Sequence, residues 1–153
     1  MKDEKLIKKT TEELLKKMTF KEVTVEVKKQ QASPILVVSV NIEEDASRLI
    51  GQSGSNLNDL QRILRLLVSK QTPESPLFLL DINGYREKRE AFLKELAREI
   101  ADQVNKTKKS VMFQPMSSYE RRIIHLGLAE RSDIVTESIG EEPERRVAVR
   151  PYP

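Results

Sequence analysis

The sequence is short of the residue types that build cross-linked and metal-bound structure. It has no cysteine, no tryptophan and only one histidine among its 153 residues. Without cysteine the chain can form no disulfide and no thiolate zinc site, and it has no cysteine nucleophile. A single histidine also cannot supply the paired imidazole ligands that many zinc sites use. We therefore expect neither a metal nor a cofactor.

Long apolar runs are missing as well. The longest, Ile35–Val38, is far too short to cross a bilayer, and the charged segment 1–17 has no apolar signal-peptide region. An amphipathic helix over residues 3–18 can also lie on a membrane surface. Its apolar side is narrow, however, so packing against a sheet is the better interpretation. We expect a soluble, cytoplasmic protein that does not bind membranes.

Neither sign of charge dominates. The chain has 27 lysines and arginines against 24 aspartates and glutamates, a net charge of +3, and the two signs are interspersed. A surface for an anionic partner must therefore arise from folding that separates the charges. No lysine follows the glycines at 51 and 54 as in a phosphate-binding loop, and residues 51–55 lack the last glycine of a nucleophile elbow. We expect no enzymatic activity and no catalytic residue.

Hydrophobic periodicity divides the first half of the chain into helices and strands. Apolar residues recur at helical spacing in three segments, and alternation or continuous apolar character marks three others. The segment 35–42 is the most continuously apolar, so we expect it at the centre of a sheet. The predicted helices cover residues 3–18, 43–50 and 55–70, and the predicted strands cover residues 21–29, 35–42 and 77–82.

The second half follows a junction at Asn83-Gly84, a dipeptide typical of turns. Domains are therefore expected at residues 1–83 and 84–153, in an α+β protein. Ser117, with Glu120 three residues later, forms a capping box that opens a helix. The other predicted elements are a helix over residues 85–105 and strands over 111–113, 134–139 and 145–149.

Each long helix is expected to bury one apolar stripe. In the helix over 55–70, Gln61, Arg62 and Arg65 fall outside this stripe. The expected stripes consist of Leu57, Leu60, Ile63, Leu64, Leu67 and Val68 in that helix, of Tyr85, Phe92, Leu93, Leu96, Ile100 and Val104 in the next, and of Tyr119, Ile123, Ile124 and Leu128 in the last.

The segment Gly51-Gln52-Ser53-Gly54 lies between two predicted helices, shortly after a predicted strand. Two glycines three residues apart allow a tight turn that a sugar–phosphate chain can approach closely. The amides that begin the next helix then face a phosphate, which the helix dipole also favours. A G-x-x-G tetrapeptide alone is more often a simple turn. Here the tetrapeptide lies between two predicted helices, which are themselves flanked by predicted strands. This context favours binding of a sugar–phosphate chain over a simple turn.

In this context the sequence resembles a KH domain of the type II arrangement, α-β-β-α-α-β. In that family the G-x-x-G loop clamps about four nucleotides by their backbone, so the resemblance implies that residues 51–54 form the clamp. The middle of such loops often carries lysine or arginine, whereas Gln52 and Ser53 are uncharged. Three arginines nearby can supply the charge, or can equally form a solvated helix face: Arg48, Arg62 and Arg65.

A second constellation is formed by Arg121 and His125, four residues apart in a predicted helix. Residues at this spacing share a helix face, and Arg122 is a neighbour of the histidine as well. Arginine offers a planar, permanently charged fork, and imidazole offers a ring donor and a stacking face. The pair can therefore form a two-pronged phosphate site. The alternative, usual for a lone histidine, is a half-buried side chain with no role.

This spacing is similar to that of the R-x-x-x-H domain, known for binding single-stranded nucleic acids. Further residues extend the resemblance to the bacterial SpoIIIJ-associated protein family, also called Jag or KhpB, over roughly residues 35–150. Many members carry an extra N-terminal domain, which this sequence is expected to lack because it begins with a short helix before the KH strands. The matching residues are Asp81, Gly84, Tyr85, Arg86, Arg89, Pro115, Met116, Ser117, Tyr119, Glu120, Thr136, Glu137, Ser138, Gly140, Pro143, Arg145, Arg146 and Val147.

The resemblance implies sequence-tolerant binding of single-stranded RNA by a regulator or RNA chaperone. Single-stranded DNA remains open as the ligand, and so does a protein-interaction role with a second small KH protein. Only one of Arg145 and Arg146 should face phosphate, because neighbours in a strand point to opposite sides. With few aromatic residues, we expect little base stacking. The expected contacts are Gly51, Gln52, Ser53, Gly54, Arg62, Arg65, Arg86, Arg89, Arg121, Arg122, His125, Arg145 and Arg146.

Overall fold

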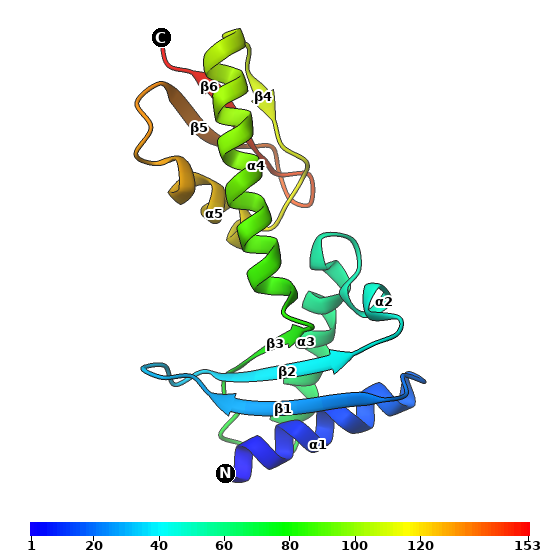
Figure 1. Cartoon of the computed structure of the whole chain (residues 1–153). Coiled ribbons are helices and arrows are strands. Elements are labelled where there is room, and N and C mark those ends of the chain that lie inside the picture. The colour runs from blue at the N-terminus through cyan, green and yellow to red at the C-terminus, as the bar shows by residue number, and fades with distance from the viewer. The chain divides into compact units, whose positions relative to one another are not determined.

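The computed structural model describes residues 1–153 as two compact units, Met1–Arg86 and Glu87–Pro153 (Figure 1). The boundary expected at residues 83 and 84 falls just before this division, which itself lies in the first turn of a long helix. Both units combine helices with a small three-stranded sheet. The expected α+β class is therefore confirmed.

The N-terminal unit begins with a helix whose charges match its dipole. Asp3 and Glu4 lie in its first turn and Lys16 and Lys17 in its last, as the partial charges at helix ends favour. The predicted order α-β-β-α-α-β is confirmed. The elements are α1 (Lys2–Lys17), β1 (Val23–Lys29), β2 (Leu36–Ile42), α2 (Ala46–Ile50), the 3-10 turn η1 (Gln52–Gly54), α3 (Ser55–Ser69) and β3 (Phe78–Ile82).

The sheet of this unit has the strand order β1-β2-β3. Strands β1 and β2 run antiparallel, with Val25 opposite Val40, whereas β2 and β3 run parallel, with Val38 opposite Leu80. The prediction that the most continuously apolar strand, β2, is central is confirmed. Its position leaves β3 as an outer strand beside the helix that follows the glycine turn.

The core of the N-terminal unit joins one face of each long helix to the sheet. Leu64 of α3 and Ile7 of α1 are fully buried in one cluster with Val38. Two placements in α3 were wrong: Ile63 is exposed and Gln61 is buried. The buried ridge of α3 runs through Leu57, Leu60, Gln61, Leu64 and Val68, and Gln61 belongs there because its carbonyl satisfies a main-chain amide of β3.

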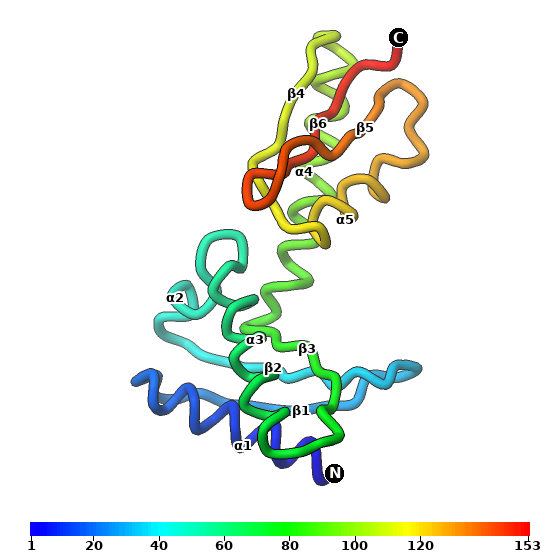
Figure 2. The backbone as a smooth tube through the Cα atoms, turned by 180° about the vertical axis from the view of Figure 1, so that it is seen from behind, coloured from blue at the N-terminus to red at the C-terminus, as the bar shows by residue number.

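The C-terminal unit has the strand order β4-β6-β5, with both pairs antiparallel. Seen from behind in Figure 2, its strands lie in front of the long helix. The serine half of the predicted capping box is confirmed, because the Ser117 hydroxyl accepts a hydrogen bond from the Glu120 amide at 3.3 Å. The Glu120 carboxylate is paired with Arg89. The elements are α4 (Tyr85–Thr107), β4 (Val111–Met112), α5 (Ser118–Leu128), β5 (Ile134–Ile139) and β6 (Arg146–Pro151).

The core of the C-terminal unit lies between α4, α5 and the sheet. Helix α4 contributes Ala97 and Ala101, both fully buried, to one apolar cluster with Ile124 of α5 and Val149 of β6. Two predicted core residues are instead exposed, Phe92 of α4 and Tyr119 of α5. Periodicity misplaced them because each lies at the margin of its apolar stripe, where the neighbouring layer ends.

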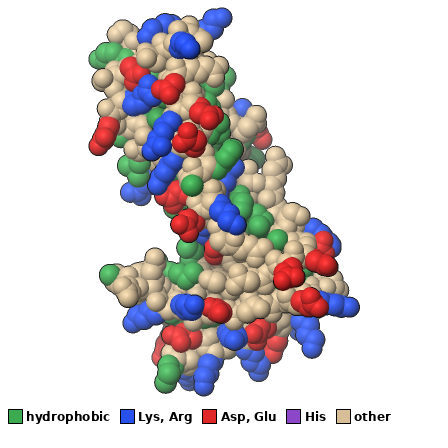
Figure 3. All heavy atoms as spheres, in the orientation of Figure 1, with side chains coloured by type: hydrophobic (Ala, Val, Ile, Leu, Met, Phe, Trp, Pro, Cys, Tyr) green, Lys and Arg blue, Asp and Glu red, His purple; other side chains and the backbone are tan.

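The visible face of the molecule in Figure 3 carries both signs of charge, with no large basic region. On the face shown in Figure 3, lysines and arginines alternate with aspartates and glutamates. None of the helices combines the length with the apolar composition that a bilayer crossing requires. A binding surface for a polyanion must therefore be built locally, at particular turns and helix faces.

Candidate nucleic-acid interface

The turn between α2 and α3 depends on glycine at its first position. Gly51 has φ +72° and ψ 179°, a backbone region open essentially only to glycine. A Cβ atom there would lie 2.6 Å from Asn56 Cγ and 2.8 Å from the Asn56 main-chain nitrogen. Asn56 also ties the two helices together, because its Nδ2 donates to the Arg48 carbonyl at 2.8 Å. The turn is therefore held in one shape.

The other end of the turn opens α3. Gly54 has φ +79°, and a Cβ atom there would lie 2.9 Å from the Tyr85 ring, which packs behind the turn. Helix α3 begins at Ser55 without a side-chain cap. The Ser55 amide donates to the Gln52 carbonyl. The amides that follow it have no partner within the helix, and the side chains of Gln52 and Ser53 beside them are exposed. The turn thus presents a positive helix end to solvent.

Two arginines close to the turn are only weakly held. The guanidinium of Arg48 lies 3.7 Å from Asp45, and that of Arg62 lies 3.8 Å from Asp59, with all four side chains largely exposed. Exposed ion pairs at such distances contribute little stability. Either arginine can therefore exchange its carboxylate for a phosphate at small cost.

Arg65 and Arg86, both expected to contact nucleic acid, bind main-chain carbonyls along the outer edge of β3. Arg65 Nη2 donates to the Phe78 carbonyl at 3.1 Å, and Arg86 Nε donates to the Leu80 carbonyl at 2.7 Å. Gln61 completes the set, since its Oε1 accepts from the Leu80 amide at 2.8 Å and from Arg86 Nη2 at 3.2 Å. Edge strands expose such groups to pairing with other chains. Sequence reasoning missed Gln61 because its partner amide lies in another element.

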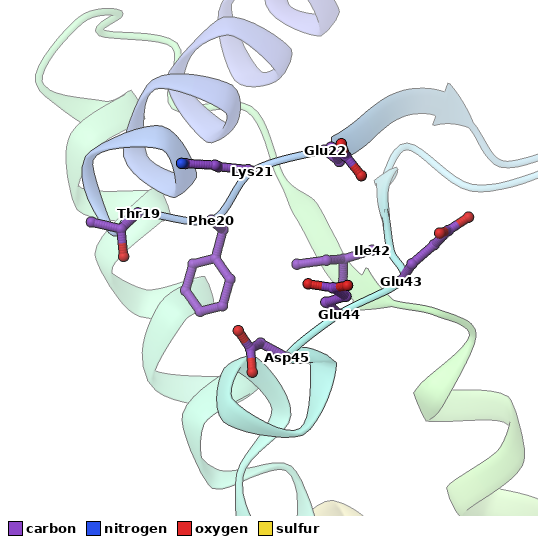
Figure 4. Close-up of a pocket in the computed structure, with 8 residues that line it drawn as sticks. All are labelled: Thr19, Phe20, Lys21, Glu22, Ile42, Glu43, Glu44 and Asp45. Carbon is purple, nitrogen blue, oxygen red and sulfur yellow. The ribbon is translucent and has the colours of Figure 1, made fainter.

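A hollow near the start of α2 is acidic. Its volume is about 350 Å³, and its lining includes Glu22, Glu43, Glu44 and Asp45 but only one basic residue, Lys21. Figure 4 shows the last three carboxylates following one another along the segment between β2 and α2. Four carboxylates beside one amine repel a phosphate chain. A polyanion is therefore expected to approach the turn from the side of Gln52 and Ser53.

In the C-terminal unit the Arg121 side chain is buried. It is only 8% exposed, its Nη1 donates to the Met116 carbonyl at 2.6 Å, and its Nη2 donates to Glu142 Oε1 at 2.8 Å. These bonds tie α5 to the segments before it and after β5. Arg89 is similarly engaged, because its Nε donates to the buried Glu120 carboxylate at 2.8 Å. Neither arginine presents an open fork to solvent.

His125 is half-buried, with hydroxyl groups at both ring nitrogens. Its Nδ1 lies 2.8 Å from Thr136 Oγ1, and its Nε2 lies 2.8 Å from Ser138 Oγ. The two hydroxyls are on the same face of β5, two residues apart. A neutral imidazole has one donor and one acceptor nitrogen. One of the two hydroxyls therefore accepts a hydrogen bond from the ring, and the other donates one to it. The histidine therefore fastens β5 to α5.

The remaining arginines of the predicted site differ in their freedom. Arg146 is half-buried and lies beside Glu144, with Nη2 3.3 Å from the carboxylate and Nε 3.2 Å from the carbonyl. The exposed side chains of Arg122 and Arg145 have no ion pair or hydrogen bond. In the C-terminal unit they are the two arginines of the predicted site without a partner in the protein.

The environment of His125 leads to a prediction about pH. Burial, and secondly the positive charge of Arg121, lowers the pKa of His125 below its ordinary value of 6.5. As the pH falls, His125 is therefore protonated in the unfolded chain before it is protonated in the folded protein. Its contribution to the free energy of unfolding is complete above pH 6.5 and is lost as the pH falls below 6.5. As the only imidazole, His125 gives one NMR titration curve, whose midpoint we expect below 6.5.

A matched variant isolates this effect. In His125→Gln the side chain still bonds hydroxyls but does not titrate, so the loss of stability between pH 7.5 and pH 5.5 in urea unfolding should be smaller than in the unchanged protein. A midpoint at or above 6.5, or equal losses in both proteins, would contradict the described packing of the ring.

Comparison with known proteins agrees with this geometry. Residues 91–151 match the family model of the R-x-x-x-H domain, a segment that covers most of the C-terminal unit and contains both Arg121 and His125. The C-terminal unit is therefore an R-x-x-x-H domain.

Curated relatives extend the likeness into the N-terminal unit. Proteins named "RNA-binding protein KhpB" are 42% identical over 113 residues in Clostridium symbiosum, which is 73% of this chain and 51% of the relative, and 39% identical over 108 residues in Bacillus subtilis, which is 69% and 52%. Both alignments are longer than the whole C-terminal unit. The chain belongs to the KhpB, or Jag, family, and it spans about half the length of these relatives.

Proposed function

We propose that this protein binds single-stranded RNA by its sugar–phosphate backbone, without catalysis and with little sequence preference. The observation that carries the proposal is the turn at residues 51–54, where two glycines with positive φ precede a helix that has no side-chain cap. A helix start of this kind can hold an anion. Three relatives from different organisms are named RNA-binding proteins. The R-x-x-x-H domain in the second unit agrees with the same ligand class.

In the N-terminal unit, the proposed action is that of a KH domain. The first amides of α3 bind a phosphate, favoured by the positive end of the helix, while Gln52 and Ser53 add hydrogen bonds. Arg62, exposed and weakly paired, supplies charge to the adjoining phosphate. Arg65 and Arg86 act by holding the edge of β3 in place beside α3.

In the C-terminal unit, the proposed contacts come from the two arginines without partners, Arg122 and Arg145. Arg121 and His125 are positioning residues, since their polar atoms are occupied within the domain. The choice left open between Arg145 and Arg146 then falls on Arg145, because Arg146 is held by Glu144. Arg89, paired with buried Glu120, also acts by holding the fold.

Binding at the turn predicts a loss of affinity when Gln52 and Ser53 are both changed to Asp. Two negative charges within about 4 Å of a phosphate oppose binding by roughly 1 kcal/mol each, so affinity for a short single strand should fall at least tenfold. The measurement is a fluorescence-anisotropy titration with a poly-U oligonucleotide at two salt concentrations. In the unchanged protein, affinity should fall steeply with salt, with a log–log slope of about 0.7 for each phosphate contact.

The control places the same charge change elsewhere. Gln30 and Gln31 are exposed in the turn between β1 and β2, at the opposite end of β2 from the glycine turn. Changing both to Asp should leave affinity within about twofold. Normal binding by the folded Gln52/Ser53 variant would remove the turn from the proposed interface, and an affinity insensitive to salt would overturn backbone binding altogether.

The competing function is a protein-interaction module that pairs with a second small KH protein. An unoccupied apolar face of α1 could serve such a contact, but Ile7 and Leu15 on that face are buried in the core. This face of α1 is therefore not available to such a partner. Co-purification distinguishes the two functions: a stoichiometric protein partner without retained RNA favours the protein-interaction module. Parallel titrations with RNA and DNA strands identify the preferred nucleic acid.

A further inference from the structure

The outer face of α5 carries an exposed aromatic residue beside an unpaired cation. Tyr119 is 60% exposed and Leu126 is 65% exposed, and Arg122 between them is exposed as well. Residues spaced by three and seven lie on one side of a helix, so the three form a single stripe. It faces away from the buried side of α5, where Ile124 and Leu128 join the core.

The chemistry of this stripe fits a nucleotide better than a protein. An aromatic face offers stacking to any base, and Arg122, which has no ion pair or hydrogen bond, offers a charged fork for the phosphate that accompanies it. The rise along a helix of about 1.5 Å per residue places the two about 4.5 Å apart along the axis. An apolar protein helix laid on Tyr119 and Leu126 would instead bury the Arg122 charge without a partner.

The other exposed aromatics of the unit are less suitable. The guanidinium of Arg89 lies over the Phe92 ring, 5.5 Å from its centroid, so one face of that ring is already occupied. Tyr152 is 65% exposed near the C-terminus, beyond β6 and on another element than Arg122. Tyr119 is thus the aromatic ring that is exposed on the same helix face as an unpaired arginine.

We propose that Tyr119 stacks against a base of the bound single strand while Arg122 holds an adjacent phosphate. This inference rests on the proposed function and specifies it: the R-x-x-x-H domain grips bases as well as backbone, through the exterior of α5. The expectation from composition that stacking contributes little therefore does not apply at this position. Stacking is tolerant of sequence because every base has a π-face, so the proposal agrees with weak sequence preference.

The absence of tryptophan makes the stacking directly observable. Tyr119→Trp places the chain's single tryptophan in the stripe, and its fluorescence should be quenched when a poly-U or poly-A single strand is added. A strand of the same length with abasic sugars should bind more weakly and quench little. Tyr152→Trp is the matched control, equally exposed and in the same unit, and it should show little quenching with either strand.

Affinity measurements complete the test. Tyr119→Ala should weaken binding about tenfold, in the range measured for loss of one stacked base, with an unchanged salt slope, whereas Tyr119→Phe should bind like the unchanged protein. Arg122→Met should lower the salt slope by about 0.7. If the unchanged protein binds but Tyr119→Ala binds equally well, or both tryptophan probes respond alike, stacking is wrong while the proposed function stands. If the unchanged protein retains no single strand, the proposed function fails first.

Discussion

Replacing Arg121 with methionine is expected to lower the free energy of unfolding of the C-terminal unit by about 2–3 kcal/mol. The change preserves much of the side-chain volume but removes the donors to the Met116 carbonyl and to Glu142. Leaving a buried acceptor unsatisfied costs about 1–3 kcal/mol. Breaking a buried ion pair costs more, but Glu142 is 60% exposed, so water can solvate it and the loss from the pair is small.

The neighbouring residue provides the control. Arg122→Met removes the same charge one position along α5, from a side chain that is exposed and without partners, so stability should change by no more than about 0.5 kcal/mol. The stability of the C-terminal unit in both variants is measured by urea unfolding, with amide hydrogen exchange of residues 87–153 as the probe. The two variants should also differ in binding: Arg122→Met weakens it in the fully folded protein, whereas Arg121→Met weakens it only as far as it loosens the fold around α5. Equal stability of the two variants would mean that Arg121 is not buried as described.

The two residues that define the R-x-x-x-H spacing thus share a structural task. Arg121 fastens the segment between β5 and β6 through Glu142, and His125 fastens β5 through the hydroxyls of Thr136 and Ser138. His125 reaches from α5 to the outer strand β5, and Arg121 reaches to the loop that follows this strand. A spacing of four residues is what this requires, because it places both side chains on the same side of α5. The exposed side chains of that helix belong to other residues, among them Tyr119, Arg122 and Leu126.

The order of helices and strands could be predicted from the sequence because each depends on local patterns. The alternation at Val23, Val25 and Val27 produced β1, and the serine at 117 opened α5 as its spacing from Glu120 indicated. The turn at residues 51–54 was likewise predicted from two glycines in context. These features depend on residues that are close in sequence, so hydrophobic periodicity and turn-forming residues were sufficient to predict them.

The roles of individual polar side chains could not be predicted in the same way. Arg121 is paired with a carboxylate twenty-one residues away, and Gln61 accepts from an amide nineteen residues away. A polar residue on an amphipathic helix gives no local sign of such a partner. Tyr119 shows the converse, since an aromatic residue at the margin of an apolar stripe is buried or exposed according to where the next layer of the fold ends.

The second large effect is expected from Gly51→Ala, which should destabilise the N-terminal unit by about 3 kcal/mol or force the turn into another shape. The backbone at φ +72° and ψ 179° costs a non-glycine residue about 1–3 kcal/mol. The added methyl group would also lie 2.8 Å from the Asn56 main-chain nitrogen, and a main-chain atom cannot move aside as the end of a flexible side chain can. Relieving the clash would displace the start of α3 and its bond to Arg48, so single-strand affinity should fall at least tenfold.

Gly84→Ala separates backbone strain from steric clash. Gly84 has a similar φ of +68°, but a Cβ atom there would meet nothing within 4 Å, so only the cost of a left-handed residue applies, about 1–2 kcal/mol. Its affinity should remain normal, because the start of α3 is not displaced. Amide exchange within residues 1–86 and a titration with a poly-U strand compare the two alanine variants. If both lose the same stability and both bind fully, the close approach of Gly51 to Asn56 does not shape the interface, and the anion site at the start of α3 must be sought in another part of the unit.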